Sequence, residues 1–172
     1  MKEIIKKFVE KAQAMGKRNL FNKGVTSEEI AKYQKQLQEK FGITLPPLVV
    51  EFYQQFNGGC FADTSWSEED LDNTKERGDI LWNSNAFIPL EEIVSCEYFD
   101  IQEVKEETGR IFFPIIDTKG QEVLVIENGK NPILDAFHEA IEFPKDWGEL
   151  YPSFEKLLEA YIETEGDIKV IA

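Results

Sequence analysis

The chain has 172 residues, of which 42% are hydrophobic and 30% are charged, a composition typical of one globular domain with a core of its own. With 33 acidic and 19 basic residues its formal net charge is -14, which repels phosphate backbones and argues against nucleic acid as a ligand, although acidity can also serve solubility alone. The two cysteines, Cys60 and Cys96, are too few for a disulfide framework, and we expect both to be reduced.

The N-terminus carries charges where an export signal needs an unbroken apolar stretch. The most apolar run, residues 111–116, is far shorter than the ~20 residues that cross a bilayer. We therefore predict a cytoplasmic protein without a membrane span.

Residues 1–24 form a basic segment, with seven Lys or Arg and two Glu, and their net charge of +5 leaves -19 for residues 25–172. Apolar side chains recur in this segment at helical spacing: Ile4, Ile5, Phe8, Val9 and Ala12. This pattern predicts a basic amphipathic helix, followed by one domain over residues 25–172. Such a helix usually packs on its own domain. Binding to a membrane surface is the alternative, which Glu3 and Glu10 disfavour.

Local signals predict two helices next. Thr26 and Glu29 have capping-box spacing, and Gly42 can end the helix that they begin. A second helix is predicted to begin at Pro46-Pro47 and to stop at Asn57-Gly58-Gly59, since proline is tolerated in a first helical turn. The two glycines are interpreted as a helix cap, because neither a P-loop nor a dinucleotide spacing surrounds them.

The segment between Phe61 and Gly78 is polar and acidic, and we predict an exposed loop there. An aromatic residue beside carboxylates is typical of a partner contact, although a charged run is more often only solvated. The residues of this loop that we predict to bind a partner are Trp66, Glu68, Glu69, Asp70 and Asp72.

Residues 80–82 and 86–88 are short apolar pieces that predict strands. A third helix is predicted to open at Pro89 and to end at Thr108-Gly109, and it presents a second acidic surface. The residues of this surface that we predict to bind a partner are Glu97, Asp100 and Glu103.

Residues 111–116, 122–126 and 132–137 are separated by turn signals and predict an antiparallel meander, with Pro114 at an edge or a bulge. Ser153 is predicted to cap a last helix that covers the sheet and ends at Gly166. The fold class is therefore α+β, a single domain with a mostly antiparallel sheet packed by N-terminal, middle and C-terminal helices.

The residues offer little for catalysis. His138 is the one histidine, no nucleophile elbow is present, and no His and Cys cluster has zinc-ligand spacing. A pair of carboxylates at a suitable separation is expected by chance among 33 acidic residues. We predict no catalytic residue, no cofactor and no metal site, and hence a protein that is not an enzyme.

Five short motifs, in this order, resemble the SUKH superfamily over roughly residues 26–162. They are Glu28-Glu29-Ile30, Leu45-Pro46-Pro47, Asn57-Gly58-Gly59, Ile88-Pro89-Leu90-Glu91-Glu92-Ile93 and Ser153-Phe154-Glu155-Lys156-Leu157-Leu158. Each alone is a cap, a turn or a core stripe, and the order carries the resemblance. The basic N-terminal helix and the long acidic loop depart from a minimal domain of this family.

The resemblance implies an α+β binding domain, used in bacteria mainly as an immunity protein that binds and neutralises a cognate toxin, often a nuclease. A fungal relative regulates cell-wall assembly, so a regulatory or scaffolding protein with an endogenous partner is the alternative. A basic toxin would suit the acidic body, because opposite charge accelerates association. We expect a protein partner, and a monomer or weak oligomer.

Overall fold

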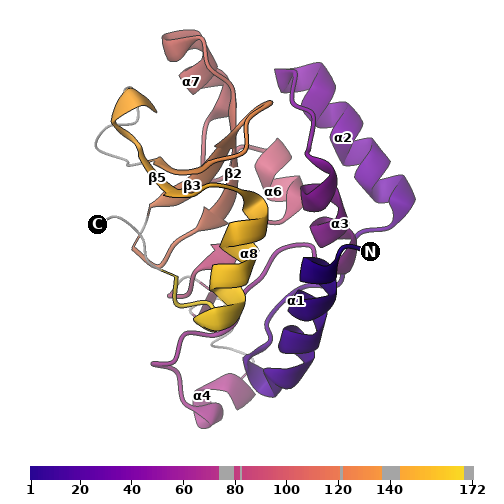
Figure 1. Cartoon of the computed structure of the whole chain (residues 1–172), viewed down its shortest axis with the longest axis vertical. Coiled ribbons are helices and arrows are strands. Elements are labelled where there is room, and N and C mark those ends of the chain that lie inside the picture. Colours follow the sequence, from indigo (N-terminus) through magenta and orange to yellow (C-terminus); the bar gives the residue numbers. More distant parts are fainter. Residues whose placement is uncertain (74–79, 82, 121, 137–143, 169–172) are drawn as a thin grey trace.

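The computed structural model describes residues 1–73, 80–81, 83–120, 122–136 and 144–168. Its five-stranded antiparallel sheet follows the chain order β1-β2-β3-β4-β5 and is packed by helices, which confirms the predicted α+β class (Figure 1). The strands are β1 (Ala86–Phe87), β2 (Phe112–Asp117), β3 (Val123–Glu127), β4 (Ile133–Ala136) and β5 (Gly148–Tyr151). The described helices are α1 (Glu3–Ala14), α2 (Ser27–Phe41), α3 (Pro47–Gln55), α4 (Glu68–Asp72), α6 (Leu90–Val94), α7 (Ile101–Thr108) and α8 (Phe154–Glu163), with 3-10 helices η1 (Gly16–Arg18) and η4 (Pro144–Asp146).

The predicted meander is confirmed as β2, β3 and β4, and β5 extends it by one strand that the sequence did not reveal. Apolar side chains on both faces of β2 and β3 are buried, as expected of central strands. The register of β2 against β3 shifts between Pro114 and Ile116, so Pro114 lies at a bulge, one of the two predicted positions. Phe137, the predicted end of the third strand, lies outside the described residues.

Local capping residues set the ends of the predicted helices. The Thr26 hydroxyl accepts a hydrogen bond from the Glu29 amide, and the Glu29 carboxylate accepts one from the Thr26 amide, each at 3.1 Å. This capping box begins α2, and Gly42 ends it with a φ of +73°. The Ser153 hydroxyl caps α8 by accepting from the Lys156 amide.

Helix α1 belongs to the main hydrophobic core, and Figure 1 shows it beside α8. Its apolar stripe is buried, and Phe8 is 0% exposed. The Phe8 ring contacts six aromatic rings: Phe21, Phe52, Phe56, Phe61, Phe87 and Tyr161. The basic N-terminal segment therefore supplies a central side chain of the core.

The third predicted helix is wrong as a single element, because the chain breaks it into α6 and α7. Cys96 adopts a φ of +58° between them, a conformation that ends a helix. The break turns Phe99 into the core, where its ring lies 6.2 Å from that of Trp147. Asp100 then begins α7 by accepting a hydrogen bond from the Glu103 amide at 3.0 Å.

The strand predicted over residues 80–82 is also wrong for its described part, because Ile80 and Leu81 are helical. The Ser84 hydroxyl donates to the Ile80 carbonyl at 2.6 Å, a contact four residues apart that suits helical backbone. Ile80 is buried in a small second cluster with Leu20, Cys60 and Ala62. Trp82 lies outside the described residues.

Candidate functional site

The Asn57-Gly58-Gly59 segment is hydrogen-bonded to three other parts of the chain: Asn22, β1 and the start of α6. This is a larger role than the predicted helix cap. Gly58 and Gly59 have φ values of +78° and +107°. A Cβ at Gly59 would lie 2.4 Å from the Leu20 carbonyl oxygen, so only glycine fits there. The backbone of Gly59 exchanges hydrogen bonds with that of Phe87, at 2.8 and 2.9 Å, which fixes β1 against this segment.

Asn57 holds helix α6 against this segment through its side chain. Its side-chain oxygen accepts from the Leu90 amide at 2.9 Å, at the start of α6, and its side-chain nitrogen donates to the Glu91 carboxylate at 2.8 Å. The junction thereby holds β1 and α6 in one orientation.

A cavity of about 310 Å³ lies beside this junction. Its walls are mostly apolar, and acidic groups line part of it. The lining residues are Asn22, Gly59, Leu81, Ala86, Phe87, Ile88, Pro89, Glu92, Tyr98 and Asp117.

Burial, and to a smaller extent neighbouring negative charge, destabilises the charged forms of the acidic groups of the cavity. Burial, and then the charge of Glu92, raises the pKa of Asp117 to about 6. Burial also raises the pKa of Glu92, with smaller effects from Glu97 and Glu91. Burial, and then the charges of Glu92, Asp117 and Glu97, raise the pKa of Tyr98 to about 12. The cavity is therefore electronegative and incompletely solvated, an environment that favours a cation. Among the described residues, no group of three or more His, Cys, Asp or Glu is placed to hold a metal ion.

The predicted acidic loop contains a short helix, α4, so the expectation of a loop without regular structure is corrected. Ser67 and Asp70 form a capping box at its start, which the sequence reasoning missed. Asp72 pairs with Lys17 at 2.8 Å, whereas Glu68 and Glu69 are exposed. Trp66 is half-buried against the second cluster, so its indole is mainly a packing group.

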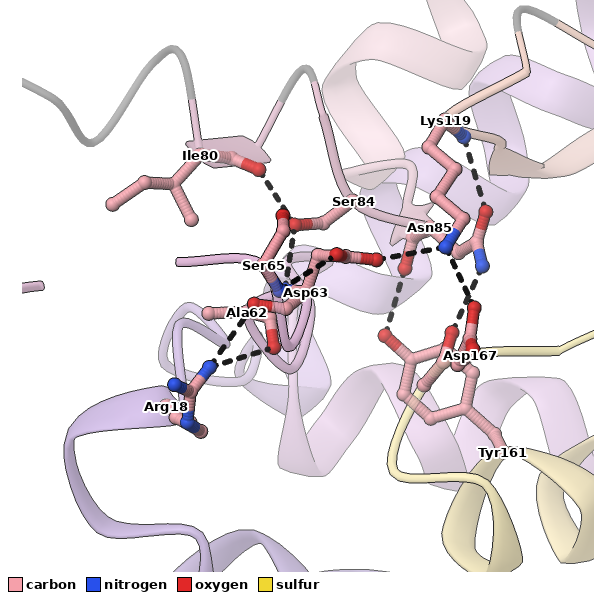
Figure 2. A network of polar contacts seen from close by, with 11 residues as sticks. Arg18, Ala62, Asp63, Ser65, Ile80, Ser84, Asn85, Lys119, Tyr161 and Asp167 are labelled. Atoms are coloured by element: carbon pink, nitrogen blue, oxygen red, sulfur yellow. Dashed lines mark hydrogen bonds and ion pairs between the residues drawn. The ribbon is translucent and has the colours of Figure 1, made fainter. Parts of the chain in front are cut away.

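A polar network fastens this loop to the rest of the molecule (Figure 2). The Arg18 guanidinium donates to the carbonyls of Asp63, at 3.0 Å, and of Trp66. Lys119 pairs with Asp63 at 2.8 Å and with Asp167 at 2.6 Å, linking the loop to the β2–β3 turn and to the segment after α8. Nothing in the local sequence distinguishes Arg18 and Lys119 from other surface cations.

The second predicted acidic surface lies far from the first, because Figure 1 shows α4 and α7 at opposite ends of the molecule. Asp100 caps α7, and Glu97 and Glu103 are exposed. The eight predicted residues therefore form two separate surfaces, not one. His138 lies outside the described residues.

No helix in the described part of the chain has the length and apolar character to cross a membrane. The antiparallel meander with its capped helices and acidic cavity defines the class as an α+β domain of the kind that the sequence motifs resemble. The family model for the SMI1 / KNR4 family (SUKH-1) matches residues 24–160, and the chain belongs to that family. No match was found among curated proteins.

Proposed function

We propose that this protein binds a basic protein partner in the cytoplasm without catalysing a reaction, and that the partner is a toxin domain which it neutralises. The observation that carries the proposal is membership of the SMI1 / KNR4 family by a chain with a net charge of -14. An acidic protein attracts a basic partner at long range and accelerates its association. A toxin that holds nucleic acid has such a basic surface, since it must bind phosphates.

The contacts that hold α4 in place support the proposal. Glu68 and Glu69 project from a helix that is capped at its start and paired with Lys17 through Asp72. The hydrogen bonds from Arg18 fix the chain that leads into it. Two exposed carboxylates on a fixed support lose less conformational freedom when a partner binds.

An endogenous partner is the second candidate. The resemblance to the SUKH superfamily also implies a regulatory role, because a fungal relative regulates cell-wall assembly. The same acidic surfaces would serve such a role. In that case a basic regulatory or envelope-assembly protein would replace the toxin.

Affinity capture from native cells tests the two candidates. The tagged full chain is used as bait at low and at high salt, and bound proteins are identified by mass spectrometry. We expect a basic toxin domain that is released at high salt and inhibited at a one-to-one ratio after purification. Capture of endogenous regulatory proteins alone would favour the second candidate, and the absence of any salt-sensitive protein partner would contradict both.

A further inference from the structure

The cavity beside β1 combines apolar walls with two carboxylates at one site, Glu92 and Asp117. We infer that it receives the side chain of a lysine or arginine from the protein partner, whose cationic end meets Glu92 and Asp117. This inference rests on the proposed binding function and adds to it a particular anchoring contact. It also places that contact on carboxylates that the sequence did not single out, with one predicted residue, Glu97, close enough for its charge to act on Glu92.

The cavity is large enough to admit a long side chain. Its volume of about 310 Å³ lies at the lower end of the range of about 300–1,000 Å³ for small-molecule sites. Ala86, Phe87 and Ile88 supply an apolar wall from β1 and the residue after it. Such a wall matches the methylene stem that lysine and arginine bury while their charged ends reach polar groups.

The carboxylates of Glu92 and Asp117 favour a side chain whose end is positively charged. Within the described part of the chain, no Lys or Arg pairs with Glu92 or Asp117, and the charge of Glu92 adds to burial in raising the pKa of Asp117. By contrast, burial alone would raise the pKa of Asp63, but its contacts with Lys119 and Ser65 together outweigh burial and lower it. A cation placed between Glu92 and Asp117 would relieve their repulsion in the same way.

Two features prepare the cavity before a partner arrives. Hydrogen bonds between Gly59 and Phe87 and between Asn57 and Leu90 fix its walls, so little ordering is required on binding. Tyr98 is a large side chain that is 38% exposed in the lining of the cavity. Its ring can contact an incoming cation.

Amide chemical shifts of the full-length protein test the inference without the natural partner. The probes are n-butylamine and n-propylguanidinium, which reproduce the stems and charges of lysine and arginine, with n-butanol as the neutral control. We expect both cations to shift the amides of Gly59, Phe87 and Ile88 in a saturable way at millimolar concentration. Butanol should leave these amides in place.

Substitution of the carboxylates sharpens the test. Glu92→Gln and Asp117→Asn should each weaken binding of the cationic probes about tenfold or more, since a charge-assisted hydrogen bond is lost. Glu103→Gln, on the exposed face of α7, is the matched control and should leave probe binding unchanged. Lowering the pH through about 6 should weaken binding to the unaltered protein, because Asp117 becomes protonated. Amide spectra of each variant also show whether it folds.

Several results would overturn the inference: no saturable shift with either cation, an equal response to butanol, or full probe binding by folded Glu92→Gln and Asp117→Asn proteins. With a captured partner, unchanged affinity of both variants would remove the anchoring role while leaving the binding function intact. Failure to capture any protein partner would instead count against the proposed function. The probe titration would still decide whether the cavity takes a cation.

Discussion

Helix α1 lies in a basic segment of the chain and α4 in an acidic one, and of the two only α1 contributes buried residues. The apolar stripe of α1 enters the main core, with Phe8 among six aromatic rings. Helix α4 contributes no buried residue and exposes Glu68 and Glu69. The difference teaches that net charge does not predict whether a segment is peripheral. The lysine-rich helix is structural, because apolar residues recur along one of its faces.

The largest expected effect is at the centre of the core. Phe8→Ala should lower the free energy of unfolding by about 3–5 kcal/mol, because it leaves a cavity that the surrounding rings cannot fill. Urea unfolding followed by circular dichroism measures this change. Lys7→Ala on the exposed side of the same helix should change stability by less than about 0.5 kcal/mol. Equal effects of the two substitutions would show that α1 is not part of the core.

A smaller and local effect is expected where the two segments meet. Arg18→Gln removes the guanidinium that binds the carbonyls of Asp63 and Trp66. The free energy for local opening of the chain into α4 should fall by about 1–3 kcal/mol, since buried hydrogen bonds to a charged group are lost. Hydrogen exchange at residues 66–72 measures this opening, with Lys23→Gln as the matched control. Unchanged exchange would mean that α4 is held by its own capping box alone.

Asp117 and Glu127 should change the stability of the protein with pH in opposite directions. The raised pKa of Asp117 means that the folded protein holds a proton more tightly between 3.8 and about 6, so its stability falls as pH rises through that range. Asp117→Asn should therefore raise the free energy of unfolding at pH 7. Burial alone would raise the pKa of Glu127, but its contacts with Arg110 and Lys130 together outweigh burial and lower it. Its contribution is therefore present at pH 7 and is lost as pH falls below 4.5.

Glu127→Gln should accordingly lower stability at pH 7. Thermal unfolding of both variants at about pH 4 and pH 7 checks the signs. Destabilisation of the protein by Asp117→Asn at pH 7 would contradict the repulsion between Asp117 and Glu92.

The smallest expected effect is on association. Replacing Glu68 and Glu69 with Gln should slow association with a captured basic partner by roughly two- to fivefold at low salt and flatten its salt dependence. Lys6→Gln with Lys7→Gln on α1 is the control of opposite charge and should not slow it. Stopped-flow fluorescence measures the rates, and unchanged rates for the Glu68 and Glu69 variant would remove α4 from the contact surface.

Sequence signals predicted the parts of the fold that depend on neighbouring residues. Helix α2 is one example, since Thr26, Glu29 and Gly42 fix its ends by local hydrogen bonds and conformation. The break at Cys96 had no such signal, because its positive φ accompanies the burial of Phe99 against Trp147, which is distant in the sequence. Strand β5 was missed because four residues at the edge of the sheet, only partly buried, carry little pattern.

The candidate sites also divide into features that neighbouring residues predict and features that depend on residues distant in the sequence. Charge alone identified the carboxylates of α4 and α7 but could not show that they lie at opposite ends of the molecule. The cavity was not predicted, because pairing of β1 with β2 brings Asp117 beside Ala86 and so near the start of α6, which carries Glu92. No short-range motif joins residues 92 and 117.

The hydrogen bonds of Arg18 and the ion pair of Lys17 hold the acidic segment to residues that lie outside the family match. The family match begins at residue 24, after both cations, whereas Asp63, Trp66 and Asp72 lie within it. A relative that lacked residues 1–23 would leave the carbonyls of Asp63 and Trp66 without this donor and Asp72 without this ion pair, so α4 would have to be held by other contacts.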